Sequence, residues 1–515
     1  MIEQKKFVLC GVVKINNTTQ ATAGPLVITE KSKSFAGEGR RLAFAFLGIA
    51  LFALFYFMPS LPPAIDPTGQ AFELSREAQL AIGLFLLAGI WWVFEVIPIG
   101  VTSIAIGVFQ AGFMIRPATV AFANFMDPSV LFILGSLMLG LAFTKAGVTT
   151  RLAFKMLTIV GEDSRKILLG VFIVTAALTH LMAHTAVAAT MFPLMLVIMS
   201  MYGKVDEPTN FGKAMFIGMA YSAGAGSMVT LLGAARAPVA LGFFQEFTGN
   251  TVSFIELSKV MFLFGWATVF LVWFLLCFVF FKPEQLKIEG LQKKVDEVKS
   301  QMGPMSVKEI FVIVLTLSVV AILALQNFVP ALQSMNKAVP MLVAAILLFM
   351  TKLFTVEDLE KGIPWNIVLL FGGAMSIGYA LWETGAAQWM AVNWLAMFEN
   401  AHWLVFVLAI AFLIAVMTNF IMNVAAIAIT LPVALVVAEY MGVNPYLILY
   451  AALTMAALPF MLLVGAAPNA IAYQSKQFTT GQFFMVGIPF TLIVLAMVAL
   501  FALVVWPLMG VPALI

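Results

Sequence analysis

Long apolar stretches separated by short polar connections run along the chain from about residue 43 to the C-terminus. A spanning helix needs roughly 20 apolar residues, and a soluble core cannot use this much apolar sequence. The pattern therefore predicts an all-α polytopic membrane protein with about eleven transmembrane helices. The apolar segments lie at 43–58, 79–97, 99–115, 129–146, 168–200, 214–247, 257–281, 308–328, 338–355, 365–382, 403–440, 446–474 and 483–510.

The Lys and Arg residues between these segments predict the orientation of the chain. Basic residues gather in the connections within 145–213 and 282–308. The opposite connections 245–256, 384–402 and 441–446 contain neither Lys nor Arg. Because basic loops stay on the cytoplasmic side, we expect the first set there, together with a polar N-terminal arm at 1–42. The expected location is the inner or plasma membrane, with the N-terminus in the cytoplasm.

Two apolar segments are expected to begin and end on the same side of the membrane. The orientation above places both ends of 168–200 inside and both ends of 403–440 outside. Each is long enough for two short helices, so we interpret them as re-entrant hairpins of opposite polarity. Non-helical backbone at membrane depth persists only where it is buried in protein or lines a cavity. The hairpin tips are therefore candidate site positions.

A polar linker at 282–307 divides the chain into two similar halves, predicted to be a first repeat at 43–281 and a second at 308–515. Three blocks recur in the same order. They are "GSLMLGLAFTKAG" (135–147) with "GGAMSIGYALWETG" (372–385), "THLMAHTAVAATMFP" (179–193) with "TNFIMNVAAIAITLP" (418–432), and "LLGAARAP" (231–238) with "LVGAAPNA" (463–470). The last pair falls within two expected broken helices, 214–247 and 446–474. Because the hairpins have opposite polarity, the halves form an inverted repeat, which is typical of secondary transporters. Lys145 and Glu383 occupy matching helix ends and are expected to be interfacial anchors.

These blocks resemble the divalent anion/sodium symporter (DASS) family, which includes citrate and dicarboxylate carriers. The phrase "FEVIPIGVTSIAIGVF" (94–109), both hairpins and the Gly-rich turns carry the resemblance, which extends from about residue 43 onward. It implies a homodimer in the lipid bilayer, with a fixed scaffold and an elevator-like transport domain. It also implies that one small organic anion and sodium ions bind between the two hairpin tips.

Family members carry Ser-Asn-Thr at each tip and Gly/Ala-Ser/Thr-Pro-Pro-Asn in each unwound turn, and this chain departs from both patterns. Its tips are Ala183-His184-Thr185 and Met422-Asn423-Val424. Its first turn places Arg236 where proline is expected, and its second turn lacks the hydroxyl residue. Carried over by position, the resemblance implies a substrate site formed by His184, Thr185, Ala234, Arg236, Asn423, Val424, Ala466 and Ala467.

The resemblance also implies two sodium sites. The better preserved one would use Thr418, Ile421, Asn423 and Gly465, which offer hard oxygen ligands. The other would use Thr179, Ala183, His184 and Gly233. In that second set an imidazole replaces an amide, and an imidazole nitrogen is a poor Na⁺ ligand. The count is therefore one or two Na⁺ ions.

Arg236 offers a replacement for the altered sodium site. A guanidinium at membrane depth costs about 2.5–3.5 kcal/mol on insertion scales unless it is partnered. Its fixed positive charge could take the place of a bound cation, or it could bind a carboxylate or sulfonate through two hydrogen bonds. Pairing with a buried acid or with a helix C-terminus is the structural alternative. We hypothesise that this carrier keeps one sodium site and uses Arg236 in place of the other.

His180 and His184 lie four residues apart and could face a transition metal. However, no third ligand cluster accompanies them, and the matched positions of the second half are Asn419 and Asn423. We expect His180 to be a hydrogen-bonded histidine inside the hairpin, and His184, at the tip itself, to contact the substrate or to gate its site. An imidazole could also carry H⁺ where relatives carry Na⁺, so H⁺ coupling or anion exchange is the alternative mechanism.

The expected function is secondary active transport of a small organic anion. A dicarboxylate is the family default, and the altered site also suits a monocarboxylate, a sulfonate or a short hydroxy acid. An intramembrane enzyme would need a nucleophile–base pair or a metal motif, and the sequence contains no HExxH. An inverted repeat with two hairpins suits alternating access better than a channel. The formal charge of +3 without a basic block gives no indication of nucleic acid binding.

Overall fold

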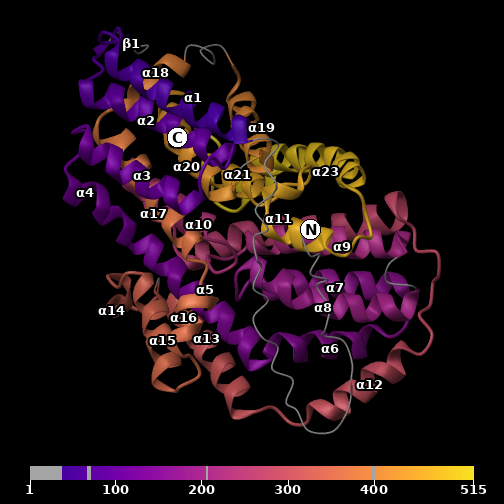
Figure 1. Cartoon of the computed structure of the whole chain (residues 1–515). Coiled ribbons are helices and arrows are strands. Elements are labelled where there is room, and N and C mark those ends of the chain that lie inside the picture. The colour runs from indigo at the N-terminus through magenta and orange to yellow at the C-terminus, as the bar shows by residue number, and fades with distance from the viewer. Residues whose placement is uncertain (1–37, 66–70, 204–206, 327, 396–400, 421) are drawn as a thin grey trace, which may run out of the picture. The chain divides into compact units, whose positions relative to one another are not determined.

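The computed structural model describes residues 38–515 apart from 66–70, 204–206, 327, 396–400 and 421. Within these residues the chain is almost wholly helical (Figure 1), and two short antiparallel strands, β1 (Ala64–Ile65) and β2 (Ala71–Phe72), form one small hairpin. Eight of the described helical segments are long and apolar enough to cross a membrane, and four shorter apolar helices accompany them. The prediction of an all-α polytopic membrane protein is confirmed.

The first half contains α1 to α11. Its helices are α1 (Glu38–Phe57), α2 (Arg76–Val93), α3 (Ile99–Gly112), α4 (Ala118–Ala123), η1 (Asn124–Met126), α5 (Pro128–Ala146), α6 (Val148–Val160), α7 (Ser164–Leu178), α8 (His184–Tyr202), α9 (Asn210–Ser227), α10 (Arg236–Thr248), α11 (Phe254–Leu275) and the π-helical η2 (Leu276–Phe280). Most of the predicted arm 1–42 lies outside the described residues. Since α1 begins at Glu38, the helix starts before the predicted boundary at 43.

The second half follows a linker helix, α12 (Leu291–Met302), which packs against α6. Its helices are α13 (Val307–Leu325), α14 (Pro330–Gln333), α15 (Ala338–Met350), α16 (Val356–Gly362), α17 (Trp365–Glu383), α18 (Ala386–Leu395), α19 (Trp403–Phe420), α20 (Asn423–Tyr440), α21 (Pro445–Ala456), η3 (Leu463–Gly465), α22 (Ala467–Tyr473), α23 (Thr480–Leu500), the π-helical η4 (Phe501–Val505) and α24 (Trp506–Leu508).

Matching glycines end matching helices in the two halves. Gly147 has a φ of 86° and separates α5 from α6, and Gly385 has a φ of 79° and separates α17 from α18. A left-handed residue after a helix suits glycine because it has no Cβ. The first hairpin then begins at α7, where Asp163 accepts hydrogen bonds from the backbone N–H groups of Arg165 and Lys166. An aspartate at this position is a strong helix start.

Helices from the two halves pack closely against each other. Helix α3 lies against α17, and α5 lies against α15. The backbone N–H of Gly100 donates to Asn366 Oδ1 at 2.8 Å, and a Cβ at Gly373 would lie 2.4 Å from the Cβ of Ser103. In a membrane the hydrophobic effect does not drive helices together, so their association depends on close packing. Small residues at such crossings let the helix backbones approach closely.

The hairpins and the broken helices form a second set of contacts. Each hairpin lies on the broken helix of its own half, with α7 against α9 and α19 against α21. The second piece of each broken helix then packs against the other hairpin, with α10 against α20 and α22 against α8. This reciprocal exchange brings both hairpin tips to the breaks between α9 and α10 and between α21 and α22.

The two expected anchor residues each form an ion pair. Lys145 Nζ lies 2.5 Å from Asp358 Oδ2. At the matching helix end, Arg116 donates to Glu383 twice, from Nε at 2.9 Å and from Nη2 at 2.7 Å. Both pairs join the first half to the second, so corresponding ends of α5 and α17 are fixed in the same way.

Candidate functional site

The tip of the first hairpin is held against the break between α9 and α10. The carbonyl of Gly233 accepts the backbone N–H of His184 at 3.0 Å and lies 3.3 Å from His184 Nδ1. His180 Nδ1 lies 3.0 Å from the carbonyl of Gly226, and the hydroxyl of Thr230 donates to the carbonyl of His180 at 2.8 Å. The prediction that His180 is a hydrogen-bonded histidine inside the hairpin is confirmed. Its imidazole bonds to the last turn of α9, whereas the imidazole of His184 bonds to the segment between α9 and α10.

Glycines make this close docking possible in both halves. A Cβ at Gly233 would lie 2.6 Å from the carbonyl oxygen of Thr179, and a Cβ at Gly465 would lie 2.5 Å from the carbonyl oxygen of Thr418. Real Cβ atoms do not approach backbone oxygen this closely, so only glycine fits at either position. Thr179 and Thr418 are matched residues of the two hairpins, and the same contact therefore occurs twice.

Arg236 begins α10 and is buried, with 1% of its surface exposed. Its Nη2 donates to the hydroxyl of Ser227 at 2.8 Å, and that hydroxyl donates to the carbonyl of Gly224 at 2.7 Å. Its Nε and Nη1 have no hydrogen-bond partner among the described residues. A buried guanidinium with two unsatisfied N–H groups is costly, so these groups are available to an anion or to water.

Two residues of the better preserved cation set, Thr418 and Asn423, are hydrogen-bonded to each other at the second hairpin. The hydroxyl of Thr418 donates to Asn423 Oδ1 at 3.0 Å and lies 3.3 Å from the carbonyl of Ala456. The carbonyl of Thr418 lies beside the Cα of Gly465, where a Cβ would come within 2.5 Å of its oxygen. Ile421, also predicted as a ligand, lies outside the described residues. The site therefore gathers hydroxyl, amide and carbonyl oxygens, which are the ligands that hard cations prefer.

The weaker cation set is also brought together, but its oxygen atoms are engaged. The Thr179 hydroxyl donates to the carbonyl of Ala176 at 2.6 Å. The Gly233 carbonyl faces both the backbone N–H and the imidazole of His184. Ala183 is the residue before α8 and offers no side-chain group. The guanidinium of Arg236 lies three residues after Gly233, so a positive charge is already built into this half of the site.

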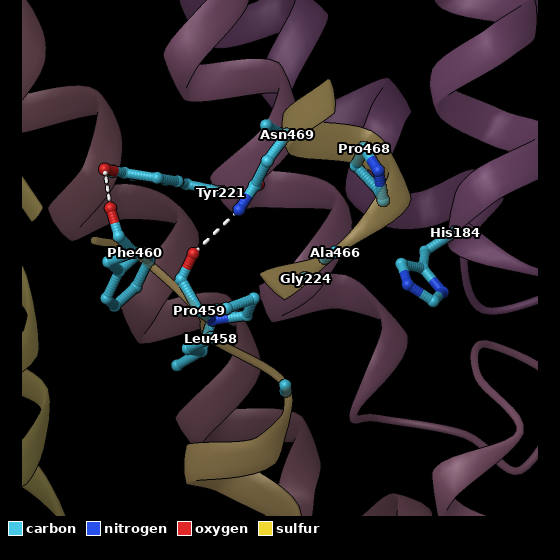
Figure 2. Close-up of a pocket in the computed structure, with 11 residues that line it drawn as sticks. His184, Tyr221, Gly224, Leu458, Pro459, Phe460, Ala466, Pro468 and Asn469 are labelled. Carbon is cyan, nitrogen blue, oxygen red and sulfur yellow. Dashed lines mark hydrogen bonds between the residues drawn. The ribbon is translucent and has the colours of Figure 1, made fainter. Parts of the chain in front are cut away.

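A small pocket lies where the first tip meets the second break (Figure 2). Its lining comes from both halves: His184, Ala220, Tyr221, Gly224, Ala457, Leu458, Pro459, Phe460, Ala466, Pro468 and Asn469. Asn469 donates from Nδ2 to the carbonyl of Pro459 at 2.7 Å, and Tyr221 donates its hydroxyl to the carbonyl of Phe460 at 2.7 Å. Of the predicted substrate residues, His184 and Ala466 line this pocket.

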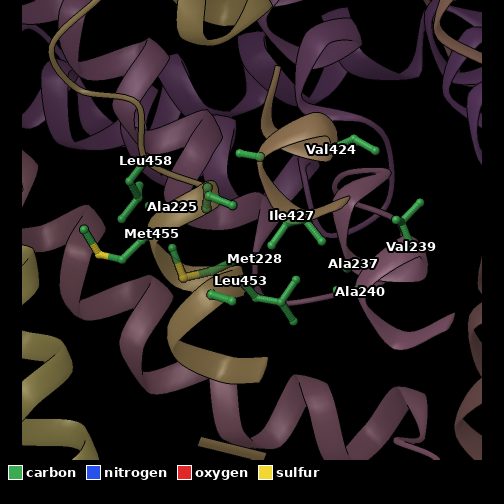
Figure 3. Close-up of a cluster of buried hydrophobic side chains, with 14 of the residues drawn as sticks. Ala225, Met228, Ala237, Val239, Ala240, Val424, Ile427, Leu453, Met455 and Leu458 are labelled. Carbon is green, nitrogen blue, oxygen red and sulfur yellow. The ribbon is translucent and has the colours of Figure 1, made fainter. Parts of the chain in front are cut away.

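The other predicted substrate residues lie around it in different surroundings. Thr185 is half-buried on the first turn of α8, and Ala234 is buried in the first break. Ala467 is exposed at the start of α22. Val424, 4% exposed, belongs to a cluster of buried apolar side chains that includes Ala225 (Figure 3). The second tip therefore presents Asn423 to the cation set and Val424 to apolar packing.

Three residues that sequence reasoning did not select contribute to the site. Ser227 holds Arg236, Tyr221 fixes the second break, and Asn469 lines the pocket. Asn469 belongs to the repeated block "LVGAAPNA" (463–470) and could have been chosen on that ground. Ser227 and Tyr221 lie before the matched block of the first half, and nothing in the sequence pattern distinguishes them from other polar residues of α9.

Comparison with known proteins places the chain among membrane transporters. The family model described as the sodium:sulfate symporter transmembrane region matches residues 47–511. The sodium-dependent dicarboxylate transporter SdcS of Staphylococcus saprophyticus is 25% identical over 440 residues, covering 81% of this chain and 83% of that protein. SdcS of Staphylococcus aureus strain RF122 is 25% identical over 441 residues, with the same coverage.

Two solved structures share the fold at low sequence identity. MtrF of Neisseria gonorrhoeae, described as illuminating a class of antimetabolite efflux pumps, gives a TM-score of 0.54 at 14% identity and covers 90% of this chain and 93% of its own. The YdaH transporter of Alcanivorax borkumensis gives a TM-score of 0.55 at 13% identity, covering 92% and 98%. Both are similar to this chain in overall fold.

Proposed function

Because the chain belongs to the sodium:sulfate symporter family and is thus a multi-pass membrane transporter rather than an enzyme, we propose that it carries a small organic anion by Na⁺-coupled, elevator-type alternating access. The observation that supports this most directly is the pocket between the first hairpin tip and the second break. An inverted repeat that brings both halves to one small pocket is typical of many alternating-access transporters.

The anion is proposed to bind beside Arg236. This side chain has two N–H groups without a described partner, and a planar guanidinium suits a carboxylate or a sulfonate. The N-terminus of α8 begins at His184 and adds the positive end of a long helix. The anion is proposed to be a dicarboxylate, the substrate class named for the staphylococcal relatives, or else a monocarboxylate or sulfonate suited to the altered site.

Sodium coupling is proposed to run through the second hairpin. The converging oxygens of Thr418, Asn423 and Ala456 support a Na⁺ site there. At the first hairpin, the guanidinium of Arg236 is proposed to take the place of a second ion, because the Gly233 carbonyl is already engaged by His184.

The oligomeric state, orientation and moving parts are proposed as follows from the family resemblance and the packing. The protein works as a homodimer in the inner or plasma membrane, with its N-terminus in the cytoplasm, where the basic connections also lie. The elevator motion carries the hairpins and broken helices as one body, since these elements pack mainly against each other. The framework formed by α3, α5, α15 and α17 is the proposed fixed scaffold.

An H⁺-coupled or exchanging carrier is the second candidate. The observation that favours it is that His184, a side chain able to carry a proton, lines the pocket. Uptake into proteoliposomes separates the two. We would load vesicles with the full-length protein and impose a Na⁺ gradient, a pH gradient or an anion gradient separately. Saturable uptake that needs Na⁺ supports symport. Uptake that follows the pH or counter-anion gradient and ignores Na⁺ would overturn Na⁺ coupling in favour of the second candidate.

A further inference from the structure

The side chains of the pocket have used their hydrogen-bond donors elsewhere. Asn469 donates from Nδ2 to two carbonyls, those of Pro459 at 2.7 Å and Leu462 at 3.2 Å, which takes both of its hydrogens. Tyr221 donates its one hydrogen to the carbonyl of Phe460. Figure 2 shows the Tyr221 bond and the Asn469 bond to Pro459. The amide oxygen and the phenol oxygen that remain can only accept hydrogen bonds.

The tautomer of His184 follows from the same accounting. Its Nδ1 lies 3.3 Å from the carbonyl of Gly233, and a carbonyl oxygen can only accept, so Nδ1 carries the proton. The other ring nitrogen, Nε2, then carries a lone pair at the pocket wall, since His184 is one of the lining residues.

The polar side chains of the pocket therefore offer acceptors from His184, Tyr221 and Asn469 and no remaining donor. A carboxylate is itself an acceptor and finds no partner among them. The donors lie beside the pocket, on Arg236, which bonds to Ser227 and through it to the carbonyl of pocket residue Gly224. A matching ligand has an anionic end for Arg236 and a hydrogen-bond donor for the pocket.

We propose that the transported anion carries a hydroxyl group next to its carboxylate or sulfonate, and that this hydroxyl donates its one hydrogen to His184 Nε2. The pocket is small and suits a group of hydroxyl size. An ammonium group or a bound Na⁺ would also find acceptors there, but each would add a positive charge beside Arg236. This inference rests on the proposed function of anion transport and assigns the chemical class of the substrate.

Matched anion pairs test the inference in proteoliposomes that contain the full-length protein. The pairs are malate and succinate, lactate and propionate, and isethionate and ethanesulfonate, each measured as Na⁺-driven uptake, with aspartate as the ammonium analogue of malate. For at least one pair we expect the hydroxylated member to reach half-saturation at a concentration about tenfold lower, the effect of one net hydrogen bond. Aspartate is expected to be no better than succinate.

Variants of the two histidines provide the matched control. H184N replaces the acceptor nitrogen with an amide that can also donate, and we expect the preference for the hydroxylated member to fall below about threefold. H180N makes the same change outside the pocket and leaves the preference unchanged. The wild-type comparison is decisive even if a variant does not fold. Equal half-saturation for both members of every transported pair overturns the inference alone, whereas absence of uptake for all of these anions overturns the proposed function.

Discussion

The guanidinium of Arg236 is held by the hydroxyl of Ser227, 2.8 Å from Nη2, across the break between α9 and α10. The bond joins the last residue of one helix piece to the first residue of the next. It therefore places a permanent positive charge inside the break while leaving Nε and Nη1 without a described protein partner. The break therefore carries both the interruption of the helix and the buried positive charge of Arg236.

If Arg236 replaces a sodium ion, removing its charge should change the coupling ratio. Proline is tolerated at the first position of a helix, where Arg236 stands, so the double variant H184N/R236P restores the pattern of relatives without breaking α10. We expect its uptake to depend on Na⁺ with a Hill coefficient that rises from about one toward two. The measurement is anion uptake against Na⁺ concentration.

The control for that experiment is S227A, which keeps the charge and removes one hydrogen bond to it. We expect an unchanged Hill coefficient and a half-saturation concentration for the anion that rises between about three- and thirtyfold. An unaltered Na⁺ dependence and an unaltered anion affinity in H184N/R236P would remove the idea that Arg236 substitutes for an ion.

A change at the second hairpin is expected to alter the Na⁺ dependence of uptake. T418V keeps the size of the side chain and removes the hydroxyl that bonds to Asn423 and Ala456. We expect the Na⁺ concentration for half-maximal uptake to rise about tenfold, as for the loss of one oxygen ligand worth roughly 1–2 kcal/mol. T430V is the matched control because Thr430 bonds only within α20, to the carbonyl of Ala426. Equal Na⁺ dependence in both variants would argue against a cation site at Thr418.

Much of this arrangement follows from patterns in the sequence. Apolar length predicts the helices, and the segment 403–440, predicted to be a re-entrant hairpin, contains the two helices α19 and α20. Matched blocks identify Gly233 and Gly465 as equivalent, and their contacts with Thr179 and Thr418 are equivalent in the structure. These features depend on local propensity and on repetition, both of which a single sequence displays.

The hydrogen-bond partners could not be predicted in the same way. Ser227 and Tyr221 meet the site because α9 packs against α7 and α22, a tertiary contact that no periodicity encodes. Val424 occupies a position that implies substrate contact, yet it packs among buried apolar side chains instead. The tautomer of His184 also depends on the carbonyl that faces its ring. Side-chain roles at a site are decided by such non-local contacts.

The two matching glycines predict a sharp steric effect. In G233A or G465A the new methyl group would lie about 2.5–2.6 Å from a backbone carbonyl oxygen of the facing hairpin, so hairpin and break must separate. We expect uptake to fall by at least about a hundredfold in each variant, in line with displacements of about 1 Å at a binding site. In G112A the new methyl group has no neighbour within 4 Å, and uptake should match wild type. Normal uptake in G233A would show that the hairpin tip does not need to dock this closely.

The ion pair between Lys145 and Asp358 predicts a dependence of stability on pH. Burial alone would raise the pKa of Asp358, but hydrogen bonds from Lys145 and from Thr355 outweigh it and hold the pKa below its ordinary value of 3.8. A carboxyl group whose pKa is lower in the folded state contributes stability above its unfolded pKa, and loses it as the pH falls through the folded pKa. The contribution is therefore complete above about pH 5 and declines below it.

Thermal unfolding of the detergent-solubilised protein between pH 3 and 7 measures this contribution. At pH 7 we expect D358N to unfold roughly 1–2 °C below wild type, the scale of a partly exposed ion pair. As the pH falls below about 4, the two curves should converge because wild type then loses the same interaction. E357Q is the control, since Glu357 pairs with Lys361 at a fully hydrated position, 73% exposed. A gap between wild type and D358N that stays constant down to pH 3 would show that the carboxylate charge does not stabilise the contact between α5 and α16.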